Sequence, residues 1–128
     1  MELAHERKKL LLIVALLFGV LFFLQGIALW FYLYWTLPWF DILTHFLGGL
    51  CTSFTMLWVV FYSGYIVPIA RTPKNVLLTA LIATFVIGVL WEVYEIVARI
   101  VFSAPFTSGY AMDSIIDLIM DMIGACGG

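Results

Sequence analysis

Residues 10–40 read LLLIVALLFGVLFFLQGIALWFYLYWTLPWF and contain no charged side chain. About 20 consecutive apolar residues are enough for a helix to cross the hydrocarbon core of a bilayer, so this stretch predicts a transmembrane span. A signal peptide would end its short apolar region at a small-residue cleavage site. Here the apolar run continues past Gly26 into tryptophans and tyrosines, which is typical of a retained helix that ends at the membrane interface.

Two more long apolar runs and one shorter helical pattern follow this span. We expect helices at about residues 8–36, 39–67, 74–102 and 112–126, all within one domain that covers residues 1–128. The fourth helix is too short to cross the bilayer fully. The predicted fold is therefore an all-α integral membrane protein, a small bundle of three full transmembrane helices plus a shorter C-terminal fourth helix.

The overall composition agrees with a chain that lies in lipid. Of its 128 residues, 65% are hydrophobic and only 11% are charged, which excludes a water-soluble globular domain. The net charge of -2 and the pI near 5.5 exclude nucleic acid as a partner, because such proteins carry a basic surface. The expected partners are membrane lipids and a lipid-linked substrate. The sequence leaves open whether the chain forms a homo-oligomer.

The basic residues predict the orientation of the chain in the membrane. Arg7, Lys8 and Lys9 precede the first span, and Arg71 and Lys74 lie between the second and third spans. Basic residues of short loops stay on the cytoplasmic side. We therefore expect a multi-pass protein of the plasma (inner) membrane with a cytoplasmic N-terminus, and the turn near residue 38 and the loop at 103–111 on the outer side.

Ionisable side chains gather near the outer ends of the last three predicted helices. Helix by helix, they are Asp41 and His45, then Glu92, Glu95 and Arg99, then Asp113, Asp117 and Asp121. Residues three or four apart share one face of a helix. At a rise of 1.5 Å per residue, the mid-helix members lie about 8 to 15 Å below the outer interface. The three polar faces are therefore expected to converge at one depth.

These groups cannot all face lipid. One charged side chain at mid-helix costs roughly 2.5 to 3.5 kcal/mol on insertion scales, so five or six would cost more than about 10 kcal/mol. The six acids outnumber the two candidate cations, Arg99 and His45, and closely spaced carboxylates do not all ionise. Protons or a bound cation must balance them. An oxygen-rich set with one imidazole and no thiolate suits a divalent metal cation, with Mg, Mn, Ca, Fe and a catalytic type of Zn site as candidates.

The leading hypothesis gives each polar residue a role in this site. The candidate metal ligands are His45, Glu92, Glu95, Asp117 and Asp121, and the candidate catalytic groups among them are His45, Glu92 and Asp117. Asp41 would orient His45 from behind as a hydrogen-bond acceptor. Arg99 and Asp113 would contact the ligands or the substrate.

Several of these residues also have plainer interpretations. His45 could simply be a hydrogen-bonded helix-packing residue. Glu95 and Arg99 have the i,i+4 spacing of an intrahelical ion pair, and Arg99 could instead bind a lipid phosphate at the interface. Asp113 lies where a helix begins, so a cap or a partner of the helix dipole is the simpler interpretation of that residue.

Three short motifs among these residues resemble those of VanZ-like membrane proteins and related predicted multi-pass membrane proteins of unknown function. The motifs are D-x3-H at 41–45, E-x2-[QE] at 92–95 and D-x3-D-x3-[ND]-x2-G-A at 113–125. Ile42 stands where VanZ proteins often have lysine, and Glu95 and Asp121 stand where they have glutamine and asparagine. The resemblance implies a multi-pass protein of the cell envelope, more anionic than VanZ itself.

The sequence leaves three classes of function open. The favoured one is an intramembrane site near the outer leaflet that binds a divalent cation and acts on a lipid-linked or envelope substrate, as a metal-dependent hydrolase or phosphotransferase if it is an enzyme. The second is a proton- or ion-conducting or transporter subunit, since intramembrane carboxylates mark such paths. The third is a structural membrane protein with a buried polar network that fixes the helix register.

Overall fold

Helices are the regular elements of the computed structural model, which describes residues 2–128 and side chains from residue 4 onward. They are α1 (Glu2–Phe31), α2 (Leu33–Thr36), α3 (Pro38–Phe61), α4 (Pro73–Val101) and α5 (Tyr110–Ala125). Three segments are long and apolar enough to cross a membrane, namely Ala4–Phe31, Pro38–Phe61 and Pro73–Val101. The expected class, an all-helical protein with three candidate spans and a shorter C-terminal helix, is confirmed.

Three helix ends differ clearly from the expected positions. The first helix begins at Glu2 and not near residue 8, and the other two ends differ for local reasons. The first helix is interrupted at Tyr32, whose φ of 56° is left-handed, so the single turn of α2 is separate from α1. The second span ends at Phe61 and not near residue 67. Beyond it the Ser63 hydroxyl donates to the carbonyl of Val59, and Gly64 has a φ of 79° that suits glycine and ends the helical path.

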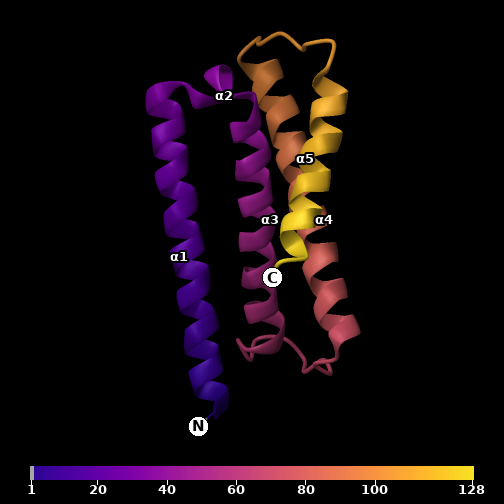
Figure 1. The fold of residues 1–128 in the computed structure, drawn as a ribbon. Helices are drawn as coiled ribbons and strands as arrows, with labels where there is room; N and C mark the ends of the chain where they lie inside the picture. Colours follow the sequence, from indigo (N-terminus) through magenta and orange to yellow (C-terminus); the bar gives the residue numbers. More distant parts are fainter. Residues whose placement is uncertain (1) are drawn as a thin grey trace.

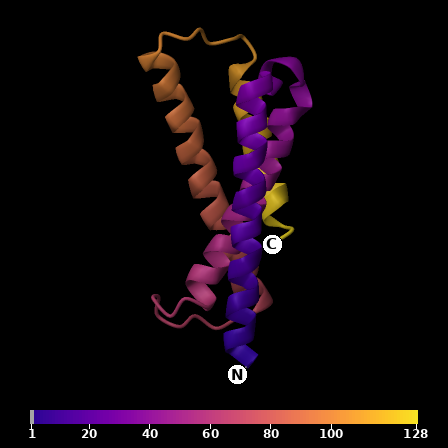
Figure 2. The same cartoon turned by 90° about the vertical axis from the view of Figure 1, so that its left-hand side faces the viewer.

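The helices are arranged around α3. Figure 1 shows α3 between α1 on one side and α4 and α5 on the other, with the N-terminus and the α3–α4 loop at one end. Among the described residues, α1 contacts α2 and α3 but neither α4 nor α5. The view in Figure 2 shows α4 leaning away from the other helices toward the end that carries the α4–α5 loop. The bundle is therefore tightest around the contact between α3 and α5.

Glycines bring α3 and α5 into backbone contact. A Cβ atom added to Gly49 would overlap the backbone carbonyl of Asp121, and one added to Gly124 would overlap the carbonyl of Phe46. Small residues at helix interfaces in membranes allow this close approach. The approach fixes the height of Asp121 relative to α3, which positions the site described below.

The buried interior is small and contains as many polar as hydrophobic side chains, and the exterior is large and apolar. The buried polar side chains are those of His45, Ser53, Ser63, Thr84, Glu92, Asp117 and Asp121. Large apolar side chains point outward, for example Phe22, Phe23 and Val101. A protein in water shows the reverse distribution. This inverted distribution is the one expected where lipid is the surrounding solvent.

Candidate functional site

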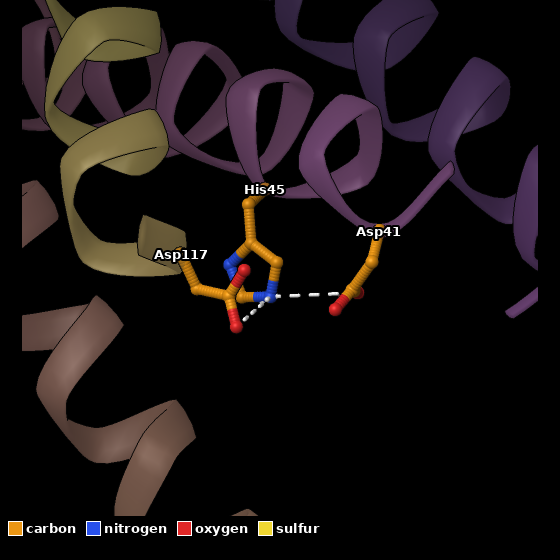
Figure 3. Close-up of side chains that lie close together, drawn as sticks. All are labelled: Asp41, His45 and Asp117. Atoms are coloured by element: carbon orange, nitrogen blue, oxygen red, sulfur yellow. Dashed lines mark ion pairs between the residues drawn. The ribbon is translucent and has the colours of Figure 1, made fainter. Parts of the chain in front are cut away.

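His45 lies at the centre of a group of carboxylates between α3 and α5. Its ring is buried, and its Nε2 atom lies 3.7 Å from Oδ1 of Asp41 and 3.8 Å from Oδ2 of Asp117, as Figure 3 shows. On the other side of the ring, Nδ1 lies 3.3 Å from Oδ1 of Asp121. Three carboxylates from two helices thus surround a single imidazole, and we call these four residues the His45 cluster.

The spacing of the sequence explains how two helices build the His45 cluster. Asp41 lies in the first turn of α3, one turn before His45 and on the same face. Asp117 and Asp121 are likewise one turn apart and are both buried on α5. The carboxylate of Asp121 lies against glycines on both neighbouring helices, because a Cβ added to Gly88 would lie 2.8 Å from its Oδ2 and one added to Gly48 would lie 3.8 Å from its Oδ1. A Cβ at Gly88 would be too close to the carboxylate, whereas one at Gly48 would make an ordinary van der Waals contact.

The two sides of the imidazole ring have different surroundings. The Nδ1 contact with Asp121 has hydrogen-bond length, so Nδ1–H can donate to that carboxylate. The Nε2 distances to Asp41 and Asp117 are too long for hydrogen bonds. With the proton on Nδ1, the lone pair of Nε2 and two carboxylates face one common space. Their ligand atoms lie within 4.8 Å of one another, so the three side chains form a group that could hold a metal ion.

Glu92 is the neighbouring buried acid on α4. It is 8% exposed, and neither carboxylate oxygen has a hydrogen-bond partner among the described residues. It lies one turn beyond Gly88, the residue that contacts Asp121. Burying a charged carboxylate without a partner is costly, so such a group takes up a proton or binds a cation or water. Glu92 is therefore a group with unused binding capacity beside the His45 cluster.

Three of the sequence-derived candidates lie outside the cluster. Glu95 accepts a hydrogen bond from Nε1 of Trp91 at 3.2 Å, and it forms no ion pair with Arg99. The Arg99 guanidinium donates to the carbonyl of Pro105 and lies 4.7 Å from the ring centroid of Tyr110. The plainer interpretation of Glu95 and Arg99 as an ion pair is therefore wrong for this structure, and Arg99 instead connects α4 to the loop and to α5.

Asp113 is exposed in the first turn of α5, where a negative charge favours the helix dipole. Gly109 occupies the cap position of this helix, so Asp113 is a partner of the dipole and not the cap. Tyr110, which follows Gly109, was not among the candidates predicted from the sequence. Its hydroxyl is buried without a partner, and its only signal in the sequence is its place at the start of the last helix.

In the structure Asp41 and Asp121 have exchanged the positions around His45 that the sequence hypothesis gives them. The sequence hypothesis has Asp121 as a ligand beside Asp117 and has Asp41 behind His45. In the structure Asp41 and Asp117 share the Nε2 side of the ring, and Asp121 lies behind it at Nδ1. Asp41, His45, Asp117 and Asp121 are brought together, Glu92 is buried on α4 one turn beyond Gly88, and Glu95, Arg99 and Asp113 make none of the contacts of the cluster.

Fold and site together define an all-helical multi-pass membrane protein with a buried His/Asp cluster between its helices. The chain belongs to the family described as "Predicted membrane protein (DUF2238)", whose model matches residues 5–127. No curated protein and no solved structure matches it significantly. The family match confirms the resemblance to predicted membrane proteins of unknown function, and the closer resemblance to VanZ-like proteins stays a prediction.

Proposed function

We propose that the chain binds one divalent metal cation between Asp41, His45 and Asp117, within the membrane. The observation that carries this proposal is the common space on the Nε2 side of His45, where three electron-pair donors face one another beyond hydrogen-bond distance. Acceptors that face one another repel unless a proton or a cation lies between them. A cation satisfies all three at once.

The distances and the charges both suit a divalent cation. Metal bonds of about 2.0 to 2.2 Å place neighbouring ligand atoms roughly 3 to 3.6 Å apart, and the Nε2 distances of 3.7 and 3.8 Å are only slightly longer. Two carboxylates balance the charge of the ion, while the imidazole is neutral. One nitrogen and carboxylate oxygens suit Mg, Mn, Fe or Zn, and a three-residue set leaves coordination positions for water or substrate.

The other acids of the site support this centre in different ways. Asp121 accepts from Nδ1–H and so fixes the tautomer and orientation of His45, as carboxylates behind metal-bound histidines do. Glu92, buried and without a partner, is placed to exchange a proton with a metal-bound water. These groups suit metal-assisted hydrolysis or phosphoryl transfer on a lipid-linked or envelope substrate.

The location of the site follows from the basic residues. Arg7, Lys8, Lys9, Arg71 and Lys74 lie at the end opposite the His45 cluster. Under the positive-inside rule that end is cytoplasmic, and the centre lies below the outer surface of the plasma membrane. An envelope substrate would reach it from that side.

The arrangement favours a local site over a conducting path. Deeper in the bundle, Ser53 donates its hydroxyl to the carbonyl of Ala125, and the Thr84 hydroxyl lies 3.5 Å from the carbonyl of Gly49. These groups are neutral and their hydrogen-bonding capacity is used by the backbone. A relay for protons or ions needs exchangeable groups across the whole membrane, whereas the buried histidine and carboxylates lie near one end.

A cation titration of purified protein in detergent tests the proposal. Mn²⁺ followed by the loss of its free electron paramagnetic resonance signal should bind at one ion per chain. Asp41→Asn and Asp117→Asn should each lower the affinity by about tenfold or more, because each removes one charged ligand. Asp113→Asn, which removes the same charge from an exposed position on α5, should leave the affinity within about threefold, since screened exposed charges contribute little.

The same titration identifies the role of Glu92 and can reject the site. Glu92→Gln should keep the Mn²⁺ affinity within about threefold, because its oxygens are not among the three ligands. Equal losses in Asp113→Asn and Asp117→Asn would mean that the chain attracts cations only through its surface charge. No bound Mn²⁺ or Zn²⁺ in the unaltered protein would reduce the His45 cluster to a structural network.

A further inference from the structure

A second candidate site lies at the other end of the molecule, between α1, α3 and the start of α4. It is a cavity of about 290 Å³ whose lining includes the first turns of α1, the second half of α3 and the α3–α4 loop. Its lining comes from segments far apart in the sequence, with Lys9 on α1, Phe54 on α3 and Arg71 in the α3–α4 loop. This volume is at the lower end of the range for small-molecule sites. The cavity suits a headgroup and not a whole lipid.

The lining of the cavity is divided between charged and apolar residues. Glu6 and Lys9 are exposed in the first turns of α1, and Arg71 is exposed in the α3–α4 loop. The apolar wall is formed by Leu10, Ile13, Phe54, Leu57, Phe61 and Val76. Charged groups therefore lie beside the hydrocarbon part of the helices, so a molecule filling this cavity would have to be both charged and apolar.

The two cations of the cavity are available for an anion. The Arg71 guanidinium lies 4.6 Å from the ring centroid of Tyr62, a cation–π contact that orients it without neutralising it. Among the described residues, neither Lys9 nor Arg71 forms an ion pair with a carboxylate. Among the charged side chains of the lining, the two cations Lys9 and Arg71 outnumber the one acid, Glu6, and Gly128 lines the cavity through its backbone.

We propose that this cavity binds the phosphate group of a membrane phospholipid, with the adjoining acyl chain against Ile13 and Phe54. Lysine and arginine form charge-assisted hydrogen bonds with phosphate, and the arginine can do so with two parallel bonds. The apolar wall begins directly below them, as the glycerol and acyl groups of a phospholipid do. The site is separate from the His45 cluster and depends on none of its residues.

Binding of dihexanoyl phosphatidylglycerol to the detergent-purified full chain, measured by isothermal titration, tests the proposal. The double variant Lys9→Gln with Arg71→Gln should bind about tenfold more weakly or worse, since each charged hydrogen bond is worth about 1.5 kcal/mol or more. The matched control is Lys8→Gln with Lys74→Gln, which removes the same charge from the same end but from outside the cavity. Its affinity should stay within about twofold of the unaltered chain.

A third variant separates a lipid headgroup from free phosphate. Ile13→Trp fills the apolar wall, so it should weaken binding of dihexanoyl phosphatidylglycerol while inorganic phosphate binds weakly to every variant. Inorganic phosphate that binds as tightly as the lipid, and is unaffected by Ile13→Trp, would replace the phospholipid with a free anion as ligand. Equal losses in both double variants would overturn the site altogether, because the effect would then belong to the charged surface as a whole.

Discussion

His45→Ala should abolish stoichiometric metal binding and lower the affinity for Mn²⁺ or Zn²⁺ by about 100-fold or more, an effect at the upper end of those measured for residues around metal sites. The imidazole is the one nitrogen ligand, and its loss leaves Asp41 and Asp117 facing each other across an empty space. Elemental analysis of the purified protein and a cation titration both measure this loss.

The other histidine of the chain is the matched control. His5→Ala removes an imidazole from an exposed position near the N-terminus and should retain the metal. Because His45→Ala also deprives Asp121 of its partner, His45→Gln gives a second measurement in a variant that keeps a side-chain amide beside Asp121. Retention of one metal per chain in folded His45→Gln and His45→Ala would refute the proposed centre.

Gly49→Ala should be strongly destabilising, by about 2 kcal/mol or more. The added methyl group would overlap the backbone carbonyl of Asp121, and a backbone cannot rotate away as a flexible side chain can. The helices α3 and α5 would have to separate, which would also move Asp117 and Asp121 away from His45. Thermal unfolding in detergent, followed by circular dichroism, measures the loss.

Two glycines of α1 provide the comparison for this prediction. A Cβ added to Gly19 or Gly26 meets no atom within 4 Å. Alanine there should be neutral or stabilising by up to about 1 kcal/mol, because it favours the helix more than glycine does. If Gly49→Ala were as stable as Gly19→Ala, the close contact between α3 and α5 would not exist in the folded protein.

The spans were predictable from the sequence because their signal is local. An uncharged stretch such as residues 10–40 must be a helix in lipid, where every backbone polar group needs a partner within the segment. The exact ends of the helices were less predictable. The break at Tyr32 depends on a left-handed backbone at a tyrosine, and few residue types other than glycine, asparagine and aspartate signal that conformation.

The polar faces were predictable, but the geometry within them was not. Helical spacing places Asp41 with His45 and Asp117 with Asp121. Which acid faces which ring nitrogen depends on how far α5 slides along α3, and that is set by contacts at Gly49 and Gly124 between residues far apart in the sequence. Likewise, nothing in the local sequence of α4 shows that this helix leans away from the other helices toward the end that carries the α4–α5 loop.

The distance along the chain between the two halves of the His45 cluster bears on how the protein is made. His45 and Asp121 are separated by 76 positions. Synthesis proceeds from the N-terminus, so α3 enters the bilayer with Asp41 and His45 before Asp117 and Asp121 exist. In the nascent chain Asp41 and His45 must be shielded by the insertion machinery or by water until α5 arrives, and the arrival of α5 is therefore the step that completes the His45 cluster.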